Sequence, residues 1–437
     1  MNGTGRKMTI ECILESGTFF PRQTNYIEDF NSLSERLKIA QFNLRKIPIN
    51  TLLNMFNSFS RALVKDNSVK EIEGIAFLSN WLRKSNLEKL INQNLGNLDV
   101  LNQFIGSGNK RVKAQPKGLV CHWIAGNIPT LSIFSLIQSM LVRNSNILRI
   151  PDQSIEATIL LLKVFAKIEE VGIKGSDLLK AIAIVYYPSS DQIANASLSI
   201  VADIRVVWGG LTAVQAIQEL THREHCEDII FGPKYSFSVL DNEILDSPDL
   251  EKFIRRFATD IVAFEQSACS SPHIFFIESN QTDEKFTKVI NLFSKELTRL
   301  MKILPKEYIN QIIATKIINK RAEYGLSIDK NIISSKSNDW TILIDNNIRL
   351  EEPIQSRTIW IKPVPSIMDI PPLITKNIQT IGCAFSNKDK FINFVDIATY
   401  KGVARCVAPG QMNIFDSPWD GIYFLQRLVN FVTVNLS

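Results

Sequence analysis

The feature that most constrains the fold is a regular alternation of two patterns between Lys117 and Phe231. Short apolar runs recur about five times, and amphipathic stretches with short turns separate them. The apolar runs predict buried strands, and the stretches between them predict helices, for example from about Ser154 to Glu170. The runs are GLVCHWIA, ILRI, AIAIVYY, IRVVW and EDIIF. This order predicts an α/β fold with a doubly wound, mostly parallel sheet, which binds ligands at the carboxyl ends of its strands.

The remainder of the chain suggests two further regions. Residues 1 to about 100 contain apolar residues at three- and four-residue spacing, which predicts amphipathic helices. From about Tyr235 to Ala404 we expect the strands HIFFIE, TILI and RTIWIK and a long helix from Asp283 to Ile303. The last part is rich in turn residues, and we expect it to end in an apolar helix, IYFLQRLVNFV. A length of 437 residues favours two or three domains.

Composition excludes several classes of protein. The net charge of +5 is small and evenly spread, which argues against a nucleic-acid partner. The six cysteines lie far apart without a CxxC pair, as in a reduced protein and not a disulfide framework. The longest apolar stretch, LSIFSLIQSMLV, is shorter than the ~20 residues of a membrane span, and the first residues do not resemble a signal peptide. We therefore expect a soluble, cytoplasmic protein without a membrane span.

The segment FEQSACSSP places Cys269 among small residues, just before an apolar run. Small neighbours leave room for a substrate to approach the sulfur, and a thiolate is a strong nucleophile near neutral pH when its pKa is lowered. A buried structural cysteine explains the same pattern. Glu265 and His273 flank the thiol and could tune it or move a proton, or serve only the structure.

Three other motifs follow predicted strands. Trp208-Gly209-Gly210 joins a strand to a helix, where glycine lets a ligand approach the backbone, or simply makes a tight turn. Asn127, in HWIAGNIP, could donate its amide to an oxyanion or cap the next helix. Arg149 and Asp152, in LRIPDQS, could contact the phosphate and ribose of a nucleotide or form a solvated turn.

A metal site is not indicated. His222, His225 and Cys226 occur together in THREHC, but no second pair with zinc spacing exists elsewhere in the sequence. We expect an enzyme without a metal.

Together and in this order, the motifs are more specific. HWIAGNIP, VVWGG, FGPKYSF, FEQSACSSP and GVARCVAPGQMNIFDSPWDG follow one another from about Lys117 to the C-terminus. This order resembles the aldehyde dehydrogenase superfamily, and within it the LuxC-type fatty acyl-CoA reductases. The resemblance implies an N-terminal helical region (1–100), a Rossmann-like cofactor domain (101–234), an α/β catalytic thiol domain (235–404) and a C-terminal segment (405–437) that returns to the cofactor and oligomerisation region.

The resemblance also assigns roles to residues. Cys269 falls on the nucleophile, Asn127 on the oxyanion-binding residue, and Trp208, Gly209 and Gly210 on the turn near the nicotinamide. Arg149 stands where the superfamily usually has a lysine that touches the adenine ribose. Asp152 stands where an acid would favour the free 2′-hydroxyl of NAD, although Arg149 could serve a 2′-phosphate. The implied cofactor is NADPH, with NADH as the other option.

The resemblance further implies a direction of reaction. Oxidising aldehyde dehydrogenases carry a Glu that activates water, whereas the matching stretch here, Phe231-Gly232-Pro233-Lys234, has no carboxylate. We therefore expect NADPH-dependent reduction of a long-chain fatty acyl thioester to the aldehyde. The implied partners are fatty acyl-CoA or an acylated partner protein, such as an acyl-protein synthetase or acyltransferase, and a second copy in a homo-oligomer. The alternatives are an oxidising aldehyde dehydrogenase and a non-catalytic scaffold for acyl transfer.

Overall fold

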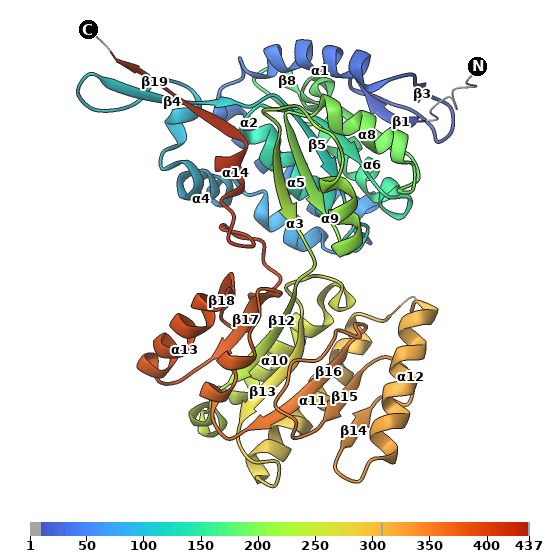
Figure 1. Cartoon of the computed structure of the whole chain (residues 1–437), viewed down its shortest axis with the longest axis vertical. Coiled ribbons are helices and arrows are strands. Elements are labelled where there is room, and N and C mark those ends of the chain that lie inside the picture. Colours follow the sequence, from blue (N-terminus) through green and yellow to red (C-terminus); the bar gives the residue numbers. More distant parts are fainter. Residues whose placement is uncertain (1–9, 307–308, 436–437) are drawn as a thin grey trace. The chain divides into compact units, whose positions relative to one another are not determined.

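The computed structural model describes residues 10–306 and 309–435 and divides the chain into two compact units (Figure 1). Unit 1 comprises residues 1–232 and 415–437, and unit 2 comprises residues 233–414. The expected boundary after residue 234 lies two residues from the observed one. The expected boundary after residue 404 falls inside unit 2, and the N-terminal helical region is part of unit 1.

Unit 1 is built on an eight-stranded sheet with the order β11-β10-β5-β6-β9-β1-β2, and β3 also pairs with β1. Five adjacent strands of this sheet are the ones predicted from the apolar runs, and they pair in parallel. They are β5 (Leu119–Trp123), β6 (Ser145–Arg149), β9 (Ile182–Tyr186), β10 (Ile204–Trp208) and β11 (Glu227–Phe231). The doubly wound sheet is therefore confirmed.

Helices cover both faces of this sheet. The apolar side chains of α5 (Leu131–Leu141) and α6 (Asp152–Ala166) belong to one buried cluster, and those of α8 (Gln192–Val201) and α9 (Leu211–Gln218) to another. The chain runs from β5 outward through β6 to β9 and then returns to β10 on the other side of β5. The winding direction reverses between β5 and β10, which is where such sheets form a ligand crevice at their carboxyl ends.

The N-terminal residues extend this unit in a way that the sequence did not indicate. β1 (Ile10–Glu15) pairs antiparallel with β9, and β2 (Thr18–Phe19) and β3 (Tyr26–Ile27) pair with β1. The predicted helices follow as α1 (Phe30–Leu44), α2 (Ile49–Lys65), α3 (Ile75–Trp81) and α4 (Lys84–Leu95). A small hairpin, β7 (Glu169–Glu170) and β8 (Ile173–Lys174), and α7 (Gly175–Leu178) connect α6 to β9.

Unit 2 contains a seven-stranded sheet with the order β14-β15-β16-β13-β12-β17-β18. All its pairs are parallel except that of β14 with β15. The strands are β12 (Tyr235–Leu240), β13 (Pro272–Glu278), β14 (Asn331–Ser334), β15 (Thr341–Ile344), β16 (Thr358–Val364), β17 (Ile378–Ala384) and β18 (Arg405–Val407). The helices are α10 (Leu250–Val262), α11 (Glu284–Ile303), α12 (Gln311–Leu326) and α13 (Lys388–Tyr400).

The predicted C-terminal helix is wrong. The segment IYFLQRLVNFV contains only the short α14 (Phe424–Arg427) and then becomes β19 (Val429–Asn435). β19 pairs antiparallel with β4 (Lys110–Pro116) along its whole length, and the two form a ribbon at the edge of unit 1 (Figure 1). The β-branched run in VNFVTVN suits an extended strand, and the partner strand supplies its backbone hydrogen bonds.

Among the described residues, no helix combines the length and the apolar character that a membrane crossing requires.

Candidate functional site

Cys269 lies in unit 2, in a loop of residues 263–271 that connects α10 to β13 and is called the thiol loop below. Its side chain is half-buried. The sheet holds the backbone of Cys269, because the Ser236 hydroxyl on β12 donates to the Cys269 carbonyl oxygen at 2.7 Å. The same hydroxyl accepts from the backbone N–H of Thr380 on β17 at 3.0 Å. Two adjacent strands therefore hold the thiol residue at one end of the sheet.

The thiol loop begins with a strained backbone. Phe264, Glu265 and Gln266 are consecutive residues in the left-handed region, with φ of 54°, 49° and 60°. Residues without glycine's freedom adopt this conformation at a cost of order 1–3 kcal/mol each. Residues 355–357 form a second left-handed run, with φ of 76°, 54° and 58°. The Ser356 N–H donates to the Glu265 carbonyl oxygen at 2.8 Å, so each run supports the other.

Gln266 anchors the loop to the sheet. Its buried amide donates to the carbonyl oxygens of Pro272 at 2.8 Å and Thr358 at 3.2 Å, and its Oε1 accepts from the Thr358 N–H at 2.8 Å. These bonds connect the loop to the first residues of β13 and β16. The glutamine of FEQSACSSP is therefore a structural support for the loop.

The residues that follow the thiol are held by Asn413. The hydroxyls of Ser270 and Ser271 donate to Asn413 Oδ1 at 2.8 and 3.1 Å, and Asn413 Nδ2 donates to the Asp260 carbonyl oxygen at 2.9 Å. The Asp260 carboxylate accepts from the N–H groups of Gly410 at 2.6 Å and Met412 at 3.3 Å. Burial raises the pKa of Asp260 to about 7. This buried network joins α10, the thiol loop and residues 410–413.

The two ionisable neighbours of the thiol in sequence have other partners. Glu265 forms an ion pair with Arg357, with a Nε–Oε1 distance of 2.9 Å, and its other oxygen lies 3.9 Å from Lys306 Nζ. His273 is buried on β13, and its Nδ1 has no hydrogen-bond partner in the described part of the chain. Burial lowers the pKa of His273 to about 3, so the ring is neutral near pH 7. The ion pair of Glu265 and the burial of the neutral His273 ring are both consistent with structural roles for these residues.

In unit 1, Asn127 lies in the exposed turn between β5 and α5. The N-cap of α5 is Thr130, so Asn127 does not cap this helix. The preceding Gly126 lies against Gln153, because a Cβ there would be 2.0 Å from Gln153 Nε2 and would displace that side chain. The turn therefore packs against the residues that follow β6, and Asn127 stands beyond the carboxyl end of a strand at the reversal point of the sheet.

Trp208 ends β10, the other strand at the reversal point, and Gly209 and Gly210 follow it. The Trp208 ring stacks on Phe231 with centroids 3.7 Å apart, and its Nε1 donates to the Ser135 hydroxyl at 3.1 Å. A Cβ on Gly210 would meet no atom within 4 Å. Packing within the unit therefore does not require this glycine, and the open space above it leaves room for a ligand.

Arg149 is the last residue of β6, and Asp152 lies three residues beyond it. Arg149 is 9% exposed, donates to the Tyr187 carbonyl oxygen at 2.9 Å and lies over the Tyr187 ring. Its Nε has no partner among the described residues, and burial lowers its pKa. Asp152 is the first residue of α6 and pairs with Arg22 at 2.9 Å. Unit 1 thus gathers Asn127, the Gly209–Gly210 turn, Arg149 and Asp152 after three neighbouring parallel strands.

These residues fit a dinucleotide. The open space above Gly210 and the unpartnered Nε of Arg149 both stand at the carboxyl ends of the strands, where a doubly wound sheet binds nucleotides. Asp152 supplies an acceptor for a ribose hydroxyl at the same edge.

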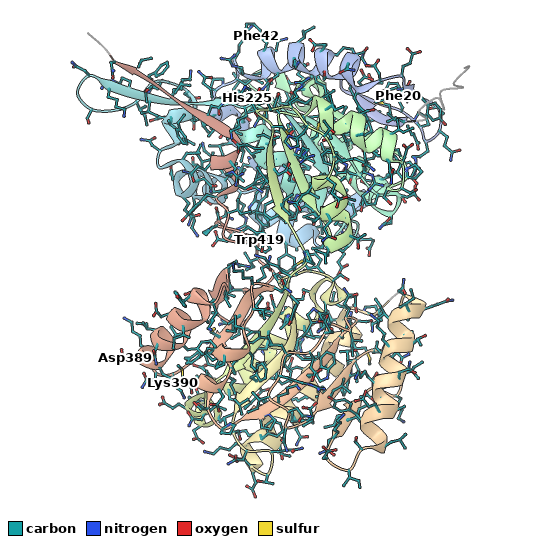
Figure 2. The ribbon with its side chains drawn as sticks, in the orientation of Figure 1. Phe20, Phe42, His225, Asp389, Lys390 and Trp419 are labelled. Atoms are coloured by element: carbon teal, nitrogen blue, oxygen red, sulfur yellow. The ribbon has the colours of Figure 1, made fainter. Side chains whose placement is uncertain are left out.

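No group of three or more His, Cys, Asp or Glu side chains in the described residues could hold a metal ion, the THREHC segment around His225 (Figure 2) included.

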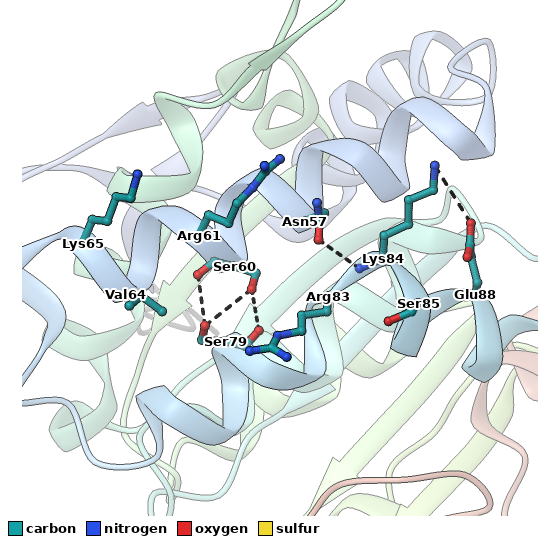
Figure 3. Close-up of a pocket in the computed structure, with 10 residues that line it drawn as sticks. All are labelled: Asn57, Ser60, Arg61, Val64, Lys65, Ser79, Arg83, Lys84, Ser85 and Glu88. Carbon is teal, nitrogen blue, oxygen red and sulfur yellow. Dashed lines mark hydrogen bonds and ion pairs between the residues drawn. The ribbon is translucent and has the colours of Figure 1, made fainter.

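A separate cavity of about 650 Å³ lies between α2, α3 and α4 of unit 1 (Figure 3). Arg61, Lys65 and Arg83 stand at its exposed rim, but its buried hydroxyls, Ser60 and Ser79, bond to each other and to each other's carbonyl oxygens. Because both hydroxyls already have hydrogen-bond partners, they give no sign of a missing ligand in this cavity.

Sequence reasoning did not identify Ser236, Asp260 or Asn413 as parts of the thiol site. Asn413 lies 143 residues from Ser270, and only the fold brings them together. Gln266 was visible in FEQSACSSP, but its role depends on Thr358 on another strand. The sequence indicated the thiol itself because small residues surround it.

The chain is similar to known acyl-CoA reductases over most of its length. Residues 26–431 match the family described as acyl-CoA reductase (LuxC). A long-chain acyl-protein thioester reductase from Vibrio harveyi is 27% identical over 414 residues, which cover 94% of this chain and 82% of that protein. The Aliivibrio fischeri protein of the same name is 26% identical over 413 residues, which cover 92% of this chain and 80% of that protein.

Solved structures with the same fold are aldehyde dehydrogenases. One is the NADP-dependent glyceraldehyde-3-phosphate dehydrogenase from Bacillus halodurans C-125, complexed with NADP. It has a TM-score of 0.70 at 14% identity, and the match covers 98% of this chain and 100% of that chain. Aldehyde dehydrogenase 21 from Physcomitrella patens also has a TM-score of 0.70, at 11% identity, and covers 97% of each chain. The expected aldehyde-dehydrogenase-like fold is confirmed.

Proposed function

Because the chain belongs to the LuxC family of acyl-CoA reductases, we propose that it reduces a long-chain fatty acyl thioester to the aldehyde through an acyl group carried on Cys269. The observation that carries this proposal is the construction of the thiol loop. Ser236, Gln266 and Asn413 fix a half-buried cysteine between small residues. A cysteine that served only packing would need no such set of supports.

The reaction begins when the Cys269 thiolate attacks the carbonyl carbon of the thioester. The tetrahedral oxyanion needs hydrogen-bond donors, each worth roughly 3–4 kcal/mol in such sites. We propose the Cys269 N–H as one donor and, as the resemblance implies, the Asn127 amide as the other. The bond between the carbonyl carbon and the donor's sulfur then breaks, and the donor leaves as a thiol after protonation. The acyl group is now attached to Cys269 as a thioester.

The second half-reaction regenerates the thiol. When bound, NADPH supplies the hydride that reduces the thioester carbon. The thiohemiacetal on Cys269 then collapses, the carbon–sulfur bond breaks, and the aldehyde leaves with the thiolate restored. Trp208, Gly209, Gly210, Arg149 and Asp152 would hold the nucleotide, with Asp152 and Arg149 toward the adenine ribose. NADPH is our proposal for the cofactor, with NADH as the other option.

The lack of an evident general base near the thiol favours reduction over hydrolysis. The segment from Phe231 to Lys234 contains no carboxylate, and Glu265 is tied to Arg357. Burial also leaves His273 neutral and without a described partner. The acyl-enzyme thus lacks an evident general base to activate water, and it persists until hydride transfer.

For the donor, we propose an acylated partner protein, with acyl-CoA as an alternative substrate. The support is the name of the relatives, which are acyl-protein thioester reductases. The acyl donor would then be an acyl-protein synthetase or acyltransferase. We also propose that the protein works as a homo-oligomer, as the resemblance implies.

The test is steady-state NADPH oxidation with a long-chain acyl-CoA, with quantification of the fatty aldehyde released. We expect one aldehyde per NADPH and a loss of at least 10³-fold in Cys269→Ala, the scale of removing a covalent nucleophile. Cys406→Ala, which removes another half-buried thiol of unit 2, should keep its activity.

Oxidation of aldehyde to acid with NAD, without a thiol, would instead identify an oxidising aldehyde dehydrogenase. No turnover with either acyl-CoA or an acylated protein would favour the scaffold.

A further inference from the structure

A residue from the N-terminal strands contacts the turn after β6, although the two are far apart in the sequence. Arg22 lies in the loop between β2 and β3, and its Nη2 is 2.9 Å from Oδ1 of Asp152, which is 130 residues away. Asp152 begins α6, directly after the strand that ends at Arg149. The N-terminal strands therefore deliver a guanidinium to the edge of unit 1 where the nucleotide-binding residues gather.

This guanidinium is held in place by more than one partner. Its Nε donates to Oε1 of the buried Glu11 on β1 at 2.7 Å, and the same oxygen accepts from the Gln23 N–H at 2.6 Å. The Arg22 guanidinium carbon also lies 5.0 Å from the ring centroid of Tyr186, the last residue of β9. Arg22 nevertheless keeps 40% of its side chain exposed, so a fixed cation faces solvent beside Asp152.

The charges at this turn are relevant to the choice of nucleotide. An acid after the second strand of a doubly wound sheet binds the ribose 2′-hydroxyl, and a nearby arginine accommodates a 2′-phosphate. β6 is that second strand, because it pairs with β5 on the side away from the reversal point. Asp152 alone would repel a 2′-phosphate. The Arg22 guanidinium, which pairs with Asp152 as well as with Glu11, reduces that repulsion and offers further N–H donors in a planar fork suited to phosphate.

A second arginine at the same turn lacks a full set of partners. Arg149 is nine-tenths buried, and its Nε has no hydrogen-bond partner in the described part of the chain. The exposed ion pair of Arg22 with Asp152 adds little to stability, so Arg22 can be substituted without unfolding the unit.

We infer that Arg22 is the residue that selects a 2′-phosphorylated nucleotide, and thus NADPH over NADH. The inference rests on the proposed function, because it concerns the cofactor of that reaction. It assigns a role in binding to the N-terminal strands, which lie outside the predicted Rossmann-like region.

The test separates the 2′-phosphate from the rest of the nucleotide. Calorimetric titration of the full chain would compare adenosine 2′,5′-bisphosphate with adenosine 5′-monophosphate, which lacks only the 2′-phosphate. We expect the bisphosphate to bind at least tenfold more tightly. Arg22→Gln should abolish that difference and change monophosphate affinity by less than twofold. Arg22→Lys, which retains the charge without the fork, should keep part of the preference.

Arg36→Gln is the matched control. Arg36 is also an exposed arginine of the N-terminal region that pairs with a β1 carboxylate, Glu15, at 2.6 Å, but it makes no contact with Asp152. This variant should keep the full preference, and thermal melting of each variant would confirm that it is folded. In Asp152→Asn, Arg22 loses one of its two carboxylate partners and keeps Glu11, and we expect bisphosphate affinity to rise several-fold.

The inference is overturned if Arg22→Gln weakens both ligands equally or leaves the preference intact. It is also overturned if the wild-type chain binds neither ligand. Acylation of Cys269 by an acyl-CoA needs no nucleotide, so its presence in that case would show that the thioester chemistry stands while the inference about Arg22 does not.

Discussion

At the scale of single residues, the position of Cys269 depends on buried polar groups that lie far from it in the sequence. Asn413 receives both serine hydroxyls that follow Cys269 and binds the backbone of α10. Asp260 in turn holds the backbone of residues 410–412. These buried polar groups satisfy one another, and removing one leaves several without partners, which is costly in a low-dielectric interior.

Asn413→Ala should therefore both destabilise unit 2 and slow acylation. The loss of three hydrogen bonds in a buried site predicts a decrease of about 2–4 kcal/mol in the free energy of unfolding. Chemical denaturation and the rate of single-turnover acylation measure the two effects.

The control is Asn387→Ala, which removes the cap of α13 beside Asp389 and Lys390 (Figure 2). It should cost about 1 kcal/mol and leave acylation unchanged; an equal slowing in both variants would refute the positioning role of Asn413.

The buried carboxyl group of Asp260 makes stability depend on pH in a defined direction. Its pKa of about 7 in the folded chain lies above the ordinary value of 3.8, so the unfolded chain ionises first as pH rises. The free energy of unfolding of the wild type, relative to Asp260→Asn, should fall by up to about 4 kcal/mol between pH 4 and pH 7. Above pH 7 it should stay constant. A relative stability that rises with pH would show that the ionised form is favoured in the folded state.

At the scale of elements, the predictable parts are those whose information is local. β5, β6, β9, β10 and β11 were predicted from the sequence because each is a short apolar run between turn residues. β1 and β19 were not, because both depend on a strand far away in the chain: β9 for one and β4 for the other. The same limit applies to the site, where Cys269 was recognisable but Asn413 was not.

The paired left-handed runs at 264–266 and 355–357 are another long-range feature, and they support a prediction. Ser356 has a φ of 54°, which a Cβ disfavours and glycine tolerates. Ser356→Gly should therefore raise the free energy of unfolding by up to about 1 kcal/mol, net of the added entropy of the unfolded chain. Ser356→Ala keeps the Cβ and should give no such gain. Thermal and urea denaturation would compare them; destabilisation by glycine would show that the left-handed backbone is not strained here.

At the scale of the whole molecule, the two units divide the chemistry. Unit 2 carries the thiol loop on its own parallel sheet, and unit 1 carries the residues proposed to bind the nucleotide. In the proposed reaction, the acyl group forms on the thiol of unit 2, and its discharge uses the nucleotide that unit 1 is proposed to bind. An experiment that follows both steps on one protein tests the account as a whole.

That experiment is intact-protein mass spectrometry after mixing the protein with a long-chain acyl-CoA, first without and then with NADPH. We expect a single acyl adduct that forms without NADPH, disappears when NADPH is added, and is absent in Cys269→Ala but present in Cys406→Ala. If no adduct forms with acyl-CoA, the same measurement with an acylated donor protein decides. An adduct that survives in Cys269→Ala, or no adduct from either donor, would contradict the claim that Cys269 carries the acyl group.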